Sequence, residues 1–178
     1  MVDLKGNPFY LKDEQIAWVN RTLENLTLDE KVGQLFCPIG MSTDEKALFD
    51  LAANKKVGGL LFRPGKGEEV QQAHRYLQQQ AKVPMLIAAN LEAGGTGSTI
   101  DGTRIGNPML LAAGQDAEFG HHLGKVCAKE GSAVGVNWAF APVVDIDYNF
   151  HNPITNVRTY GSNPETVLNY AQGFVEGV

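Results

Sequence analysis

Two side chains that could bind a polar ligand follow the most apolar stretch of the chain. Residues 136–145 are rich in β-branched and aromatic side chains and end at Asp145. This pattern is typical of a strand that is buried on both faces and presents a carboxylate at its C-terminal end. A polar loop follows and carries Arg158 before Pro164 opens a new helix. A guanidinium group offers a fixed fork of donors to hydroxyl and carboxylate oxygens. We therefore expect Asp145 and Arg158 to be ligand-binding residues.

A second pair of candidates lies after another apolar run, residues 83–89. Asn90 and Glu92 come directly after this run and lead into a glycine-rich segment. Amide and carboxylate groups bind at fixed angles, and glycines let a loop approach a ligand closely, so one interpretation is a clamp for sugar hydroxyls. The other is a structural turn in which Glu92 pairs with a cation such as Arg104. The glycine spacing does not match a phosphate-binding loop, and no helix opens directly after it.

Alternating helices and strands must position these four residues. An amphipathic helix is predicted over residues 13–26, and Thr27 to Glu30 form a capping box for a second helix with Val32 and Leu35 on its apolar face. The remaining pattern predicts strands at 35–39, 57–62, 83–89 and 136–145, helices at 43–54, 68–81, 116–133 and 164–178, and a long loop at 90–108. Such alternation predicts right-handed βαβ units and a parallel sheet. Residues beyond the C-terminal ends of its strands should share one rim.

Two segments, in the same order, resemble the N-terminal catalytic barrel of glycoside hydrolase family 3. One runs from Leu26 to Phe36, and the other combines residues 138–145 with Arg158-Thr159-Tyr160 and Asn163-Pro164. The Arg before a small hydroxyl residue and an aromatic residue resembles the β-N-acetylhexosaminidase branch. The β-glucosidase branch usually has a Glu there and a Trp-Gly-Arg shortly before it, and this chain has neither.

At Asn90 the chain departs from the family pattern, which has an acidic residue there. Asn keeps the hydrogen-bonding shape but loses the charge, which would reduce a charge-assisted bond to a sugar hydroxyl to roughly half its strength. Glu92 and the following glycines match the family. The departure leaves the identity of the terminal sugar open.

The resemblance implies an α/β fold, a TIM (β/α)8 barrel of which residues 1–178 supply about the first four βα units, an incomplete domain. It implies that Arg158 contacts the sugar next to the cleaved bond and that Asp145 orders its loop. An equal alternative for Asp145 is a structural acceptor for backbone N–H groups. The nucleophile, the acid/base and a Lys-His pair would lie downstream of residue 178, so no catalytic residue is expected here and the chain alone is expected to be inactive.

The activity implied for the full-length protein is hydrolysis of terminal β-N-acetylglucosaminides by a retaining mechanism without a cofactor. One alternative is a β-glucosidase or β-xylosidase of the same family. Another is a non-catalytic carbohydrate-binding half-barrel. A half-barrel would expose sheet edges, so we expect it to associate with a second copy or another chain.

Composition narrows the kinds of partner, cellular location and active-site chemistry that the chain could have. The formal charge of -5 and the absence of a basic stripe argue against a nucleic-acid partner. No apolar run suggests a membrane span, and the N-terminus lacks the apolar core of a signal peptide, so we expect a cytoplasmic protein. Cys37 and Cys127 are expected to be buried and unpaired. No histidine pair has metal-binding spacing, and no Gly-x-Ser-x-Gly or Cys/His arrangement supports serine or cysteine hydrolase chemistry.

Overall fold

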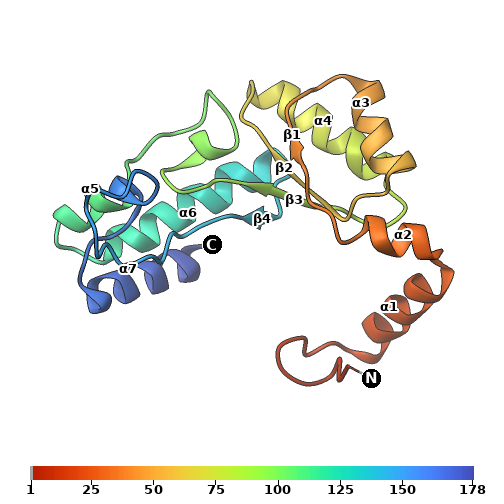
Figure 1. Cartoon of the computed structure of the whole chain (residues 1–178), viewed down its shortest axis with the longest axis horizontal. Helices are drawn as coiled ribbons and strands as arrows, with labels where there is room; N and C mark the ends of the chain where they lie inside the picture. Colours follow the sequence, from red (N-terminus) through yellow and green to blue (C-terminus); the bar gives the residue numbers. More distant parts are fainter. Residues whose placement is uncertain (1) are drawn as a thin grey trace.

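The computed structural model describes residues 2–178, and a parallel sheet lies at the centre of this part of the chain (Figure 1). Its strands are β1 (Ile39–Gly40), β2 (Gly59–Phe62), β3 (Leu86–Ala89) and β4 (Trp138–Ala139). They lie in the order β1-β2-β3-β4, and each neighbouring pair is parallel. This confirms the predicted α/β class. The sheet makes up part of a barrel.

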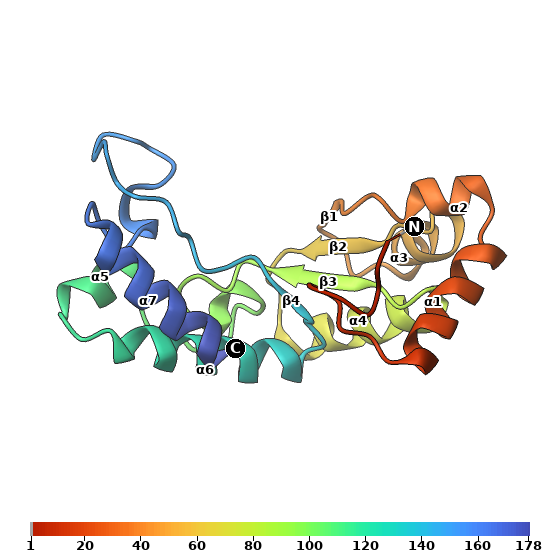
Figure 2. The same ribbon diagram turned by 90° about the horizontal axis from the view of Figure 1, so that it is seen from below.

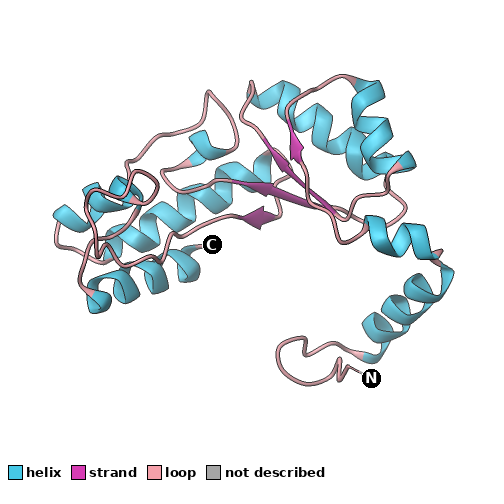
Figure 3. Cartoon of the chain, viewed as in Figure 1, coloured by secondary structure: helices cyan, strands magenta, loops and turns pink. Residues whose placement is uncertain are grey.

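Helices connect and flank the strands (Figure 3). They are α1 (Asp13–Asn25), α2 (Leu28–Gly33), α3 (Glu45–Phe49) with a π-helical continuation at Asp50–Asn54, α4 (Gly67–Gln80), α5 (Pro108–Ala113), α6 (Glu118–Ala133) and α7 (Pro164–Gly177). Short 3-10 turns lie at Gly95–Gly97 and Asn156–Arg158. Figure 2 shows α1 and α2 at one end of the molecule and α5 and α7 at the other, with the sheet between them. None of the helices in the described part of the chain is long and apolar enough to cross a membrane.

The core lies between the sheet and the helices behind it. Leu60 of β2 and Ile87 of β3 are completely buried, and α4 contributes Val70 and Leu77. Burial of such aliphatic side chains stabilises the fold by about 1.5–3 kcal/mol each. This packing holds β2 and β3 rigidly, and the candidate residues follow the ends of those strands.

Two helix starts follow from local sequence chemistry. The Thr27 hydroxyl accepts from the Glu30 N–H at 3.3 Å, and the Glu30 carboxylate accepts from the Thr27 N–H at 2.8 Å, which confirms the predicted capping box. Asn163 accepts from the Glu165 N–H at 2.8 Å, and Pro164 occupies the first turn of α7.

The predicted strand over residues 136–145 is wrong in length, because β4 contains only Trp138 and Ala139. Its partner β3 ends at Ala89, and the last backbone bond of the ladder runs from the Phe140 N–H to the Ala89 carbonyl at 2.9 Å. Beyond this point no neighbouring strand can pair with the chain. The apolar run continues as an irregular segment.

The predictions for the first strand and the long loop also need correction. The first strand was expected at residues 35–39, but β1 begins at Ile39, because the Leu35 and Phe36 N–H groups bond back to Val32 and Gly33 as a continuation of the α2 turn. After the predicted loop, Pro108 opens helix α5, which sequence reasoning missed.

Helices α1 and α2 carry an apolar surface that nothing in residues 2–178 covers. Helix α1 has no buried residue, and Val32 and Leu35, which were expected to form a packed face, are 47% and 85% exposed. These side chains line an open groove with Trp18, Leu23 and Leu28. The amphipathic pattern was therefore read correctly, but its apolar face has no partner within the described residues.

Candidate functional site

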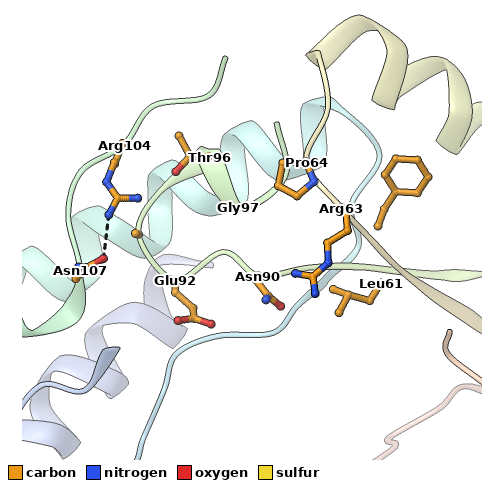
Figure 4. A pocket seen from close by; sticks show the side chains of 11 residues that line it. Leu61, Arg63, Pro64, Asn90, Glu92, Thr96, Gly97, Arg104 and Asn107 are labelled. Atoms are coloured by element: carbon orange, nitrogen blue, oxygen red, sulfur yellow. Dashed lines mark hydrogen bonds between the residues drawn. The ribbon is translucent and has the colours of Figure 1, made fainter. Parts of the chain in front are cut away.

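The candidate residues gather at the C-terminal ends of the parallel strands. Arg63 directly follows β2 and Asn90 directly follows β3, and both line a hollow of about 300 Å³ on this rim (Figure 4). Glu92 lines the same hollow. The rule that parallel strands present their C-terminal residues at one edge therefore places Asn90 and Glu92 together.

Arg158 joins this rim through a bidentate contact with Glu92. Its Nε donates to Glu92 Oε2 and its Nη2 donates to Glu92 Oε1, each at 2.8 Å. The Glu92 side chain is 14% exposed and that of Arg158 is 44% exposed. The hydrogen bonds that Arg158 donates to Glu92 raise the pKa of Arg158, and the nearby negative charge of Asp145 also contributes to this rise. The cation that pairs with Glu92 is thus Arg158 and not Arg104, which instead donates to Asn107 Oδ1 at 3.1 Å.

The Arg158 side chain is held by the packing of its neighbours. Its Nη1 donates to the Ile154 carbonyl at 3.1 Å. Thr159 and Tyr160 are buried, and the Tyr160 ring stacks on Tyr170 of α7 with centroids 5.1 Å apart. The predicted unit Arg158-Thr159-Tyr160 therefore anchors two side chains in the core and presents the third at the rim.

Asp145 lies in the exposed irregular segment beyond the end of β4 at Ala139. Its charge is close enough to raise the pKa of Arg158, so it belongs to the same electrostatic neighbourhood. Within residues 2–178, no backbone N–H group makes a hydrogen bond to its side chain. The structural alternative is therefore not seen in the described residues, and a role of Asp145 in ligand binding stays a prediction.

The glycine-rich loop folds back tightly against the end of β3. A side chain at Gly97 would collide with the Asn90 carbonyl, and Gly94 has a φ of 124°, a conformation that favours glycine. The Ile105 N–H returns to the Ala93 carbonyl at 2.9 Å. The glycines therefore allow the loop to close over the strand end and to bring residues 104–107 to the rim.

Arg63, Thr96, Arg104 and Asn107 also line the hollow. Sequence reasoning placed none of them in the site, although it named Arg104 as a possible structural partner of Glu92. Arg63 could have been found, because it directly follows a strand predicted to end at Phe62. Thr96, Arg104 and Asn107 reach the hollow only through the folded loop, and no spacing in the sequence indicates that.

The two thiols differ in their surroundings. Cys127 is buried, its Sγ donates to the Leu91 carbonyl at 3.2 Å, and burial raises its pKa to about 12. Cys37 is exposed, so the expectation that both cysteines are buried is wrong for this one. It lies two residues before β1, next to the exposed side chains of Leu35 and Phe36. No three His, Cys, Asp or Glu side chains within residues 2–178 converge as metal ligands would.

Comparisons with known proteins agree with this geometry. The sequence profile described as "Glycosyl hydrolase family 3 N terminal domain" matches residues 27–178. A "Beta-N-acetylglucosaminidase/beta-glucosidase" from Cellulomonas fimi is 42% identical over 178 residues, which are 100% of this chain and 32% of that protein. A "Beta-hexosaminidase" from Alkalilimnicola ehrlichii is 29% identical over 148 residues, covering 78% of this chain and 41% of that protein.

Solved structures give the same result. The "Beta-glucoside phosphorylase BglX" bound to 2FGlc matches with a TM-score of 0.92 and 46% identity over 98% of this chain and 32% of that chain. A family 3 β-N-acetylglucosaminidase from Paenibacillus sp. str. FPU-7 matches with a TM-score of 0.76 and 30% identity over 85% of this chain and 31% of that chain. The chain thus spans about a third of the length of several proteins that it matches.

Proposed function

The chain belongs to glycosyl hydrolase family 3, and from this membership we propose that the full-length protein cleaves terminal β-glycosidic bonds. The observation that carries the proposal is the Glu92–Arg158 pair beside Asn90 at the C-terminal rim, in a chain whose residues 27–178 match the family. Asn90, Glu92 and Arg158 offer amide, carboxylate and guanidinium groups to sugar hydroxyls. Asp145 supports the charge of Arg158.

In this proposal the chain binds the sugar and the remainder of the protein performs the bond cleavage. A retaining glycosidase needs a carboxylate nucleophile and an acid/base that flank the bond. We assign both groups to segments outside residues 1–178. The chain alone should then bind sugar weakly and show no hydrolysis.

The proposed substrates are terminal β-N-acetylglucosaminides, with β-glucosides as the main alternative and β-xylosides as a further one. The Cellulomonas fimi relative is named for both of the first two activities, which supports testing them together. The test is release of nitrophenol from the nitrophenyl β-N-acetylglucosaminide, β-glucoside and β-xyloside by the full-length protein. Cleavage of the glucoside alone would contradict the preference for the acetylated sugar.

Transfer to phosphate is a second candidate reaction. The similar structure with 46% identity is named as a β-glucoside phosphorylase, which supports this candidate. In that reaction the C1–O bond to the leaving alcohol breaks, a C1–O bond to phosphate forms, and the proton of the phosphate ends on the alcohol. Appearance of a sugar 1-phosphate, dependent on added phosphate, would distinguish it from hydrolysis.

A non-catalytic carbohydrate-binding half-barrel remains the alternative from another class. It predicts sugar binding without turnover even in the full-length protein. We also propose that the chain in isolation associates with a second copy, which the exposed apolar side chains of α1 and α2 support. A compact monomer in sedimentation at micromolar concentration would contradict association.

A further inference from the structure

We propose that the hollow between Arg63 and Arg104 is an oxyanion subsite that binds a phosphate group. The inference deepens the proposed function and rests on it, because the phosphate would be either an inorganic co-substrate or a group carried by the sugar. Both sources present the same tetrahedral, doubly charged group to the rim.

The charges that line the hollow favour an anion. Arg63 and Arg104 are its cations, and neither makes an ion pair with a carboxylate within residues 2–178. Glu92 is the acidic residue of the lining, and its charge is already paired with that of Arg158. Among the described residues, the two guanidinium groups, both on exposed side chains, are thus left without an ion-pair partner. Arginine is suited to phosphate because its donors match the oxygens in pairs.

Backbone contacts hold the main chain at both arginines, whose side chains are exposed. Arg63 continues β2, and its N–H donates to the Gly40 carbonyl at 2.9 Å. Arg104 is paired with Gly94 by a backbone bridge, so its position is fixed by the fold of the glycine loop. In Figure 4, Arg63 points toward Asn90 on one side of the hollow, and Arg104 lies on the other side beside Asn107.

The neutral part of the lining completes the subsite. Asn90 and Asn107 contribute amide groups, and Thr96 contributes a hydroxyl. All three can donate to phosphate oxygens without adding negative charge. A carboxylate at position 90 would repel the anion, whereas the amide of Asn90 does not. A volume of about 300 Å³ leaves room for the phosphate together with part of a sugar.

Phosphate binding is measured directly, so that it does not depend on turnover. Potassium phosphate is titrated calorimetrically into the full-length protein. As a control for charge screening, potassium chloride is titrated in its place at equal ionic strength. The variants are Arg63→Gln, Arg104→Gln and the double variant. Arg75→Gln, an exposed arginine of α4 outside the hollow, is the matched control.

We expect each single variant to weaken phosphate binding about tenfold, as expected for loss of a charge-assisted contact, and the double variant to abolish it. Arg75→Gln should bind like the wild type. Phosphate that binds no better than chloride, or a double variant that binds as tightly as the wild type, would overturn the subsite. Circular dichroism of each variant separates these results from a failure to fold.

Two activity measurements distinguish the source of the phosphate. If it is a co-substrate, added phosphate should accelerate aryl β-glycoside consumption and yield a sugar 1-phosphate. If the sugar carries it, an aryl 6-phospho-β-glycoside should be cleaved faster than its unphosphorylated form. Both effects should disappear in the double variant, and persistence of either in that variant would count against the subsite. Hydrolysis of nitrophenyl glycosides in phosphate-free buffer, without any phosphate binding, would refute the subsite while leaving the proposed glycosidase function intact.

Discussion

Each carboxylate oxygen of Glu92 accepts one hydrogen bond of 2.8 Å from Arg158, which lies 66 residues further along the chain. The contact joins the loop after β3 to the segment before α7. A bidentate geometry fixes the orientation of both groups as well as their distance. The pair therefore sets the shape of the rim on which a sugar would lie.

Substitution of this pair should be non-additive. Glu92→Gln and Arg158→Gln should each reduce stability, and the double variant should lose less than the two effects together, with a coupling of about 1 kcal/mol. Arg158→Lys should recover only part of the loss, because an ammonium group cannot form the fork. Urea unfolding of the four proteins gives the coupling, and additive losses would show that the pair contributes nothing of its own.

The buried carboxylate of Glu30 should make the free energy of unfolding depend on pH. Glu30 accepts from Lys56 at 2.7 Å and from Lys82 at 2.9 Å, and these bonds lower its pKa from 4.5 to about 2. Because the folded pKa is the lower one, the stabilisation is complete above about pH 4.5 and is lost as the pH falls toward 2. Urea midpoints between pH 2 and 7 should drop less steeply in Glu30→Gln than in the wild type. The control is Glu24→Gln, at an exposed position, whose urea midpoints should change with pH as those of the wild type do.

Closure of the glycine loop should not tolerate a methyl group at position 97. The Cβ of Gly97→Ala would collide with the Asn90 carbonyl, so we expect a loss of about 1–3 kcal/mol and weaker sugar binding. Gly65→Ala is the control, because its Cβ would lie 3.3 Å from a methyl group of Val70 and could be accommodated by a small shift. Thermal unfolding and sugar titration test both variants. Equal behaviour of the two would contradict a tight loop.

The two stacked tyrosines should respond differently to loss of their hydroxyl groups. The Tyr160 hydroxyl is buried without a hydrogen-bond partner in the described structure, and burial raises its pKa to about 12. The Tyr170 hydroxyl donates to the Leu111 carbonyl at 3.1 Å. Tyr160→Phe should therefore leave stability unchanged or raise it by up to about 1 kcal/mol, whereas Tyr170→Phe should lower it by about 1 kcal/mol. A clear loss in Tyr160→Phe, measured by urea unfolding, would reveal a partner for this hydroxyl.

The sequence was sufficient where the position of a residue follows from local rules. Asn90 was predicted at the rim because it directly follows an apolar run, and Arg158 because it stands in a short polar unit before a proline-initiated helix. The convergence of Asn90 and Glu92 followed from the geometry of parallel strands. The capping box at Thr27 needed only four consecutive residues.

The sequence was insufficient where tertiary contacts decide. The ion pair between Glu92 and Arg158 spans too many residues for a pattern to identify it, and the nearer Arg104 was an equally reasonable partner. The strand expected to end at Asp145 stops at Ala139, because its partner stops first. Arg104 reaches the rim through backbone contacts of the loop, which leave no trace in residue spacing.

Both edge strands of the sheet, β1 and β4, contain only two residues. So short an edge offers few free N–H and C=O groups to a further strand, which discourages growth into cross-β fibrils. In the proposed association, contacts between copies would then be made mainly by apolar side chains such as those of α1 and α2. Hydrophobic contacts weaken on cooling, so such assemblies should dissolve reversibly in the cold, as fibrils do not.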